Sequence, residues 1–115
     1  MPEYNIATHR ANSAATTNAT SVKPSGVRVV GGVFSNVNVA ARYLKLYDKA
    51  AAPVVGTDVP VLTVPLPATG QVSLALGQFG LDFANGLAYA ITGAAADADA
   101  TAIGAGDVKV NLSYF

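Results

Sequence analysis

Residues 39–66 decide the fold class of this chain. They open with the run Val39-Ala40-Ala41-Arg42-Tyr43-Leu44-Lys45-Leu46-Tyr47-Asp48-Lys49 and close with Val61-Leu62-Thr63-Val64-Pro65-Leu66. A connection punctuated by Pro and Gly, residues 52–60, joins the two runs. Successive side chains of a strand point to opposite sides, so Leu44 and Leu46 share one side of the first run and Lys45 and Tyr47 the other. We expect the Leu side to be core. We expect the Tyr-Lys-Tyr side to be half exposed, with the lysine stem lying over aromatic surface.

Strand patterns continue on both sides of this stretch. They cover residues 27–34, 71–76, 81–83, 87–92 and 107–115. Glycines 31 and 32 interrupt the first of them and predict a bulge or a close approach of two backbones. Pro60 and Pro65 remove two ladder donors, so residues 61–64 are expected to form a short or an edge strand.

Turn signals separate these segments at the spacing typical of small sandwiches. Residues 93–106 are rich in Ala, but their glycines and two aspartates favour a long loop with room for one helical turn. Fifteen Val, nine Leu and nine aromatic residues also favour pleated sheet over helix. The chain is therefore predicted to be all-β, a single small antiparallel β-sandwich of about seven strands spanning residues 27–115.

The leader, residues 1–26, has a different composition. It is rich in Ala, Thr, Ser and Asn and holds few bulky apolar side chains. Such a segment buries too little apolar surface to offset the entropy lost on ordering it alone. We expect a flexible or extended N-terminal arm that orders on a partner. The alternative is that its Thr-rich part pairs as an edge strand.

Charge and composition disfavour several classes of function. Seven Lys and Arg balance seven Asp and Glu, so we expect no general attraction to nucleic acid or to an anionic membrane surface. No apolar run is long enough for a transmembrane helix, and no signal peptide is visible. The absence of cysteine excludes disulfides and thiolate metal sites. A length of 115 residues suits one domain.

Candidate catalytic and metal-binding residues are few. His9 is the single histidine and has no Ser, Asp or second His at a useful spacing, so we predict no catalytic or metal role for it. Asp97 and Asp99 are spaced as in a calcium loop, but the Gly and the terminal Glu of an EF-hand are missing. A solvated loop is therefore the favoured interpretation of the pair, and cation binding remains the alternative. Asp58 is expected to accept hydrogen bonds from backbone amides of its own loop, with a bound cation as the less simple alternative.

Two further patterns also have ordinary explanations. Residues 31–32 and 104–106 are Gly-rich but lack the Lys-Ser/Thr or the βαβ context of a phosphate loop. Arg42, Tyr43, Lys45 and Tyr47 interleave basic and aromatic side chains, as single-strand nucleic-acid faces do. With a neutral chain, sheet packing is the favoured interpretation. We predict that the protein is not an enzyme, with no catalytic, cofactor-binding or metal-binding residues and no cofactor.

A family resemblance adds to this picture. It is carried by the run from Arg42 to Lys49, by Pro53 with Gly56-Thr57-Asp58 and Pro60, and by the Val-rich final strand. Further matching residues are Leu66-Pro67, Gly86-Leu87-Ala88, Ile91-Thr92-Gly93, Asp97, Asp99 and Asp107-Val108 through Tyr114. This pattern resembles a group of small β-rich proteins encoded by tailed phages and prophages. The resemblance runs from Val27 to the end of the chain and leaves the leader unmatched.

The resemblance implies a structural protein of the virion, made in the bacterial host cytoplasm. It implies capsid decoration (a cement protein), with the major capsid protein or another virion protein as partner. A homo-oligomer is expected, a trimer rather than a dimer, and the N-terminal arm is the expected lattice contact. The alternative is a receptor- or glycan-binding module of a tail or head appendage that uses the loops Pro53–Pro60 and Gly93–Gly106. Those loops hold no aromatic residue, which counts against a sugar site.

Overall fold

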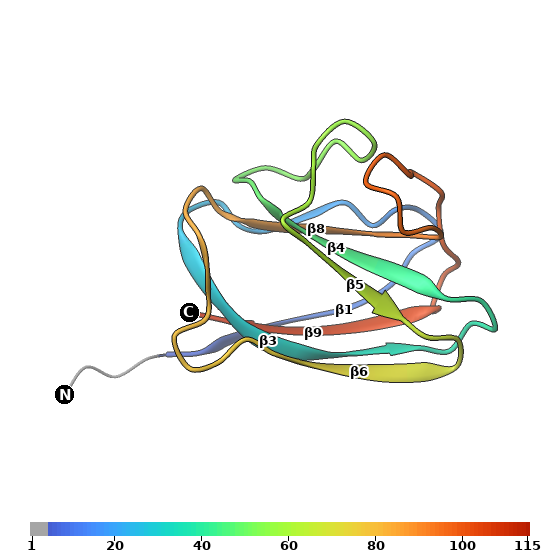
Figure 1. Cartoon of the computed structure of the whole chain (residues 1–115), viewed down its shortest axis with the longest axis horizontal. Coiled ribbons are helices and arrows are strands. Elements are labelled where there is room, and N and C mark those ends of the chain that lie inside the picture. Colours follow the sequence, from blue (N-terminus) through green and yellow to red (C-terminus); the bar gives the residue numbers. More distant parts are fainter. Residues whose placement is uncertain (1–4) are drawn as a thin grey trace.

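Nine antiparallel strands form two sheets in the computed structural model, which describes residues 5–115. Sheet A has the order β1-β9-β3-β6, with β7 also paired to β3, and sheet B has the order β2-β8-β4-β5. The two sheets lie face to face (Figure 1). The fold class is confirmed as an all-β sandwich. The strands are β1 (Ala7–Asn12), β2 (Thr20–Lys23), β3 (Val27–Asn36), β4 (Arg42–Asp48), β5 (Leu62–Leu66), β6 (Gly70–Ala75), β7 (Leu81–Phe83), β8 (Leu87–Thr92) and β9 (Val108–Tyr114).

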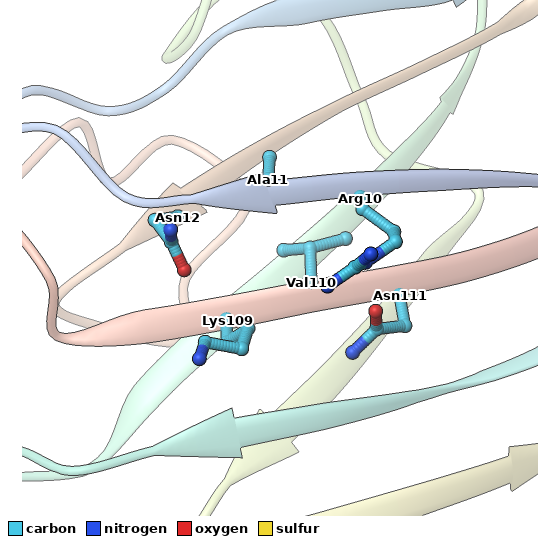
Figure 2. A pocket seen from close by; sticks show the side chains of 6 residues that line it. All are labelled: Arg10, Ala11, Asn12, Lys109, Val110 and Asn111. Carbon is cyan, nitrogen blue, oxygen red and sulfur yellow. The ribbon is translucent and has the colours of Figure 1, made fainter.

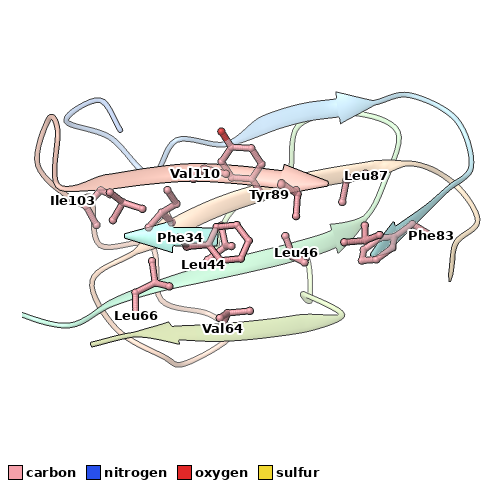
Figure 3. Close-up of a cluster of buried hydrophobic side chains, with 14 of the residues drawn as sticks. Phe34, Leu44, Leu46, Val64, Leu66, Phe83, Leu87, Tyr89, Ile103 and Val110 are labelled. Carbon is pink, nitrogen blue, oxygen red and sulfur yellow. The ribbon is translucent and has the colours of Figure 1, made fainter. Parts of the chain in front are cut away.

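The hydrophobic core fills the space between the sheets (Figure 3). Sheet A contributes Phe34, which is fully buried, together with alternate residues of β9. Sheet B contributes Leu44 and Leu46 from β4, as the period-2 pattern predicts. Alternation works here because each strand presents one of its two sides to the opposite sheet. The core residues are Val27, Val29, Phe34, Leu44, Leu46, Val64, Leu66, Phe83, Leu87, Tyr89, Ile91, Ile103, Val108, Val110 and Leu112.

The seven strands expected from the sequence correspond to β3–β9, and two local predictions are confirmed. The strand at residues 62–66 is an edge strand of sheet B. The glycine pair in β3 marks an irregular register between Val29 and Gly31, where φ of Gly31 is 150°. A Cβ atom on Gly31 would lie 2.0 Å from the carbonyl oxygen of Leu74. Glycine is required there because the backbone of β6 approaches so closely.

The leader differs from the flexible or extended arm expected from the sequence and agrees in part with the alternative, an edge strand. Residues 7–12 pair with β9 and residues 20–23 pair with β8, so each sheet gains an edge strand from this segment. Between them Ser13 is buried: its Oγ donates to Gly104 O and accepts from Val108 N, at 2.9 and 3.0 Å. Backbone hydrogen bonds to the two sheets order this segment, together with Ala11 and Val22, which pack against the core. The described part of the leader thus lies in the sandwich and is not a free arm; residues 1–4 of the predicted arm lie outside the described residues.

Candidate functional site

The outer faces of the two sheets differ in what covers them. Two loops, residues 50–60 and 93–100, lie over the outer face of sheet B (Figure 1). We call them the covering loops. They pack against each other, since a Cβ atom on Gly56 would lie 3.3 Å from the carbonyl oxygen of Ala98. The described residues place no comparable segment over the outer face of sheet A (Figure 1).

Lys45 lies beneath the covering loops, contrary to the half-exposed position expected for it. Its side chain is fully buried, and Nζ donates to the carbonyl oxygens of Ala96 and Asp99, at 2.7 and 3.1 Å. Burial lowers the pKa of Lys45, while the nearby carboxylates of Asp99 and Asp97 act in the opposite direction. The side chain thus links sheet B to the second covering loop by hydrogen bonds, and its ammonium group is shielded from solvent.

Tyr47 lies beside Lys45 and is 1% exposed, so it also departs from the expected half-exposed position. It packs with Ala88, Ala90 and Val55 into a small second cluster between sheet B and the first covering loop. Its hydroxyl group is buried and has no hydrogen-bond partner among the described residues. Burial raises the pKa of Tyr47, and Asp58 and Asp97 raise it further. The interleaved basic and aromatic residues of β4 therefore pack in the structure, as the sequence favoured.

The carboxylates of the covering loops act within their own loops. Asp58 accepts a hydrogen bond from Val54 N at 2.7 Å and forms an ion pair with Lys49, as expected for a turn aspartate. The Lys49 contact is the main reason that the pKa of Asp58 is lowered. The carboxylate of Asp99 accepts a hydrogen bond from Thr101 Oγ1, the main cause of its lowered pKa, and further ones from Thr101 N and Ala94 N. Asp97 is exposed, as expected of a solvated loop.

His9 lies on β1 and faces the space between the sheets. Its Nε2 is 3.1 Å from the hydroxyl oxygen of Tyr89, and the two rings meet edge to face with centroids 5.4 Å apart. Burial lowers the pKa of His9 and raises that of Tyr89. The contact joins an edge strand of sheet A to β8 of sheet B. His9 is therefore a packing residue that fixes the leader to the sandwich.

The glycines of residues 104–106 also have a structural role. Asp107 accepts a hydrogen bond from Gly104 N at 2.8 Å and one from Asn38 Nδ2 at 3.2 Å. It also forms an ion pair with Arg42, at 3.1 Å. The amide group that a phosphate loop would present to a ligand is thus occupied by a carboxylate of the same chain.

The outer face of sheet A presents mainly polar side chains, and we call it the open face. Strand register places its residues opposite one another, for example Thr8 with Ser113 and Val33 with Ser73. Val33, at 41% exposure, is its largest apolar side chain. The residues of the open face are Thr8, Arg10, Asn12, Val33, Ser35, Gln71, Ser73, Ala75, Lys109, Asn111 and Ser113.

A hollow of about 230 Å³ lies in the open face between β1 and β9. Arg10 and Asn12 extend from β1 toward β9, which carries Lys109 and Asn111 (Figure 2). Residues Arg10 and Asn12 were not singled out in the sequence because they belong to the leader. The available signal was the alternation of Thr8, Arg10 and Asn12 with His9 and Ala11.

A second hollow lies at one end of sheet A. It has a volume of about 530 Å³ and a mainly apolar lining that includes Ile6, Val30, Phe79 and Phe115. Phe79 is 70% exposed and belongs to the loop after β6. This exposed aromatic residue lies outside Pro53–Pro60 and Gly93–Gly106, the two loops expected to bind a receptor or glycan in the alternative function.

Within residues 5–115, no three His, Asp or Glu side chains gather as a metal ion would require. The same part of the chain contains no helix with the length and apolar character needed to cross a membrane. Comparison with protein-family models, with curated proteins and with solved structures finds no match to this chain.

Proposed function

We propose that this protein is a structural component of a tailed-phage or prophage virion that decorates the capsid through the open face of sheet A. The observation that carries the proposal is the contrast between the two outer faces. Over β4 and β8 one face is buried beneath the covering loops, whereas the other is an uncovered, mainly polar surface that spans β1, β9, β3 and β6. Non-obligate protein interfaces have this mixed and mainly polar character.

The resemblance of residues 27–115 to small phage β-proteins supports the assignment to a virion. The arm is replaced as the expected lattice contact, because β1 and β2 are strands of the sandwich. A standard interface buries about 800 Å² per partner. The total surface of the chain is 5785 Å², so such an interface would use roughly one seventh of it. Several copies around a symmetry axis, a trimer in our proposal, would add avidity.

Decoration would stabilise the particle by mass action. A protein that binds only the assembled shell lowers the free energy of that state relative to the disassembled subunits. This mechanism requires recognition and no chemical step. It therefore fits a β-scaffold in which the loop carboxylates of Asp58 and Asp99 are already engaged within the chain.

The test is to locate the protein in purified particles by cryo-electron microscopy and to count copies from quantitative gels. Many copies on the shell, in contact through sheet A, are expected. A few copies at the tail or fibre tips would contradict decoration and support the appendage module. Absence from the particles would contradict both.

Cysteine labelling identifies the docking face directly, because the chain has no cysteine of its own. Ser73→Cys places a thiol on the open face, and Ala95→Cys places one on a covering loop. A bulky maleimide on residue 73 should block attachment to undecorated shells. The same label on residue 95 is the matched control and should leave attachment intact.

Receptor or glycan binding remains the second candidate, and Phe79 is the observation that favours it. An exposed aromatic ring beside an apolar hollow is a common element of sugar and peptide sites. Substitution Phe79→Ser should then abolish adsorption of particles to host cells. Unchanged adsorption would remove this candidate.

A further inference from the structure

The hollow between β1 and β9 combines two cations with two carboxamides. Register places Arg10 opposite Asn111 and Asn12 opposite Lys109, so the two cations are diagonal neighbours on one face (Figure 2). Diagonal neighbours on antiparallel strands lie within reach of long side chains. A single group docked in the hollow can therefore contact both cations.

Neither cation is neutralised by the described part of the chain. Arg42 pairs with Asp107 and Lys49 with Asp58, whereas the side chains of Arg10 and Lys109 have no hydrogen bond or ion pair within residues 5–115. Strands β1 and β9 contain no Asp or Glu. The acid of sheet A, Asp82, lies opposite Arg28 on the neighbouring pair β3 and β7. The net charge of zero therefore conceals an excess of positive charge on the open face.

The chemistry of this cluster suits carboxylates. A guanidinium group forms two parallel hydrogen bonds to a carboxylate, and an ammonium group adds a second point of attraction. Carboxamide N–H groups beside them donate to the same oxygens. A lone small anion in such an open position is weakly held, because water and salt screen it. Carboxylates fixed on a facing protein surface gain from the contact area around them as well.

We propose that the open face docks a carboxylate-rich surface of a partner protein, with Arg10 and Lys109 as the residues that recognise it. This inference rests on the proposed function, since it names the chemistry of the partner at the same face. A protein is favoured over a nucleic acid because the open face carries two cations and no aromatic ring on which a base could stack.

The first experiment measures attachment of the full chain to undecorated shells. The variant R10E/K109E should bind about tenfold more weakly, because two attractive contacts become repulsive. Wild-type binding should weaken as salt rises from ~50 to ~300 mM, and the variant should lose that dependence. The matched control compares K109E with K23E, since Lys23 is an exposed lysine of sheet B whose side chain has no hydrogen bond or ion pair in residues 5–115. Equal thermal melts establish that each variant is folded.

The outcomes separate this inference from the proposed function. Wild-type attachment together with an unaffected R10E/K109E variant would overturn the inference and leave decoration standing. If the wild-type chain does not attach to shells, decoration fails. The inference is then decided by NMR spectroscopy, in which a poly-glutamate peptide is titrated into isotope-labelled protein. Shifts of the side-chain amide signals of Asn12 and Asn111 support it, and their absence overturns it. Stronger binding of a single-stranded DNA of equal charge would also overturn it.

Discussion

The outer faces of sheets A and B differ in whether other segments of the chain cover them. On sheet B, every residue of β8 is buried, because the core takes one side and the covering loops take the other. On sheet A, β9 alternates between buried and accessible residues, as in a sheet with one side in water. Burial on both sides makes β4 and β8 internal strands of the fold. The open face of sheet A is left available for a partner.

The largest effect is expected from deleting residues 1–26. The deletion removes β1 and β2, one edge strand from each sheet, together with the buried anchor Ser13. We expect no cooperative unfolding transition, because β8 and β9 lose their outer hydrogen-bond partners. Circular dichroism during heating measures this. A cooperative transition within a few degrees of that of the full chain would show that the leader is dispensable for the fold.

Replacing a lysine by methionine on each outer face tests how much that lysine contributes to stability. Lys45→Met makes the change beneath the covering loops. Loss of the buried ammonium group leaves the carbonyl oxygens of Ala96 and Asp99 without their donor. The free energy of unfolding should fall by about 2 kcal/mol in urea titrations. The control Lys109→Met, on the open face, should change it by less than about 0.5 kcal/mol. Similar values for both variants would contradict the difference between the faces.

Tyr47→Phe tests the packing beneath the first covering loop. The hydroxyl group is buried without a hydrogen-bond partner in residues 5–115, so its removal relieves a desolvation cost. The free energy of unfolding should rise by up to about 1 kcal/mol. Tyr43→Phe, on the same side of β4 but partly exposed, is the control and should have little effect. Clear destabilisation by Tyr47→Phe would mean that the hydroxyl group has a partner in solution.

The smallest effect is expected on the melting temperature at acidic pH. The pKa of Asp107 is lowered from its ordinary value of 3.8, first by the hydrogen bond from Gly104 N and then by Asn38 and Arg42. A carboxyl group with a lowered pKa stabilises the fold above its unfolded pKa and ceases to do so as the pH falls through the folded value. The melting temperature should therefore drop below about pH 4.

The variant Asp107→Asn isolates this contribution. It should lower the melting temperature at pH 7 and should reduce the drop seen in acid, because the group that titrates is gone. Asp97→Asn, in a covering loop, is the matched control because Asp97 accepts no hydrogen bond in residues 5–115. An identical acid profile for Asp107→Asn and wild type would show that other carboxylates dominate.

The sequence determined the seven strands from β3 to β9 and the inward sides of β4, β6, β8 and β9, and it indicated an edge or a short strand at β5. These features follow from local causes: period-2 alternation, Gly and Pro in the turns, and two prolines beside one strand. Leu44 and Leu46 could be assigned to the core for the same reason. The absence of a helix in residues 93–106 followed from glycine and aspartate spacing.

Only the tertiary structure decided that the leader pairs with both sheets and that Lys45 and Tyr47, on the second side of β4, are buried. Residues 7–12 have weak strand signals, and it is the free edge of β9 that supplies their hydrogen bonds. Lys45 has the pattern of an exposed residue, and a loop some fifty positions later in the chain buries it. The hollow between Arg10 and Lys109 arises the same way, from strands at opposite ends of the sequence. Such contacts depend on which distant segments meet, and no local pattern of residues encodes that.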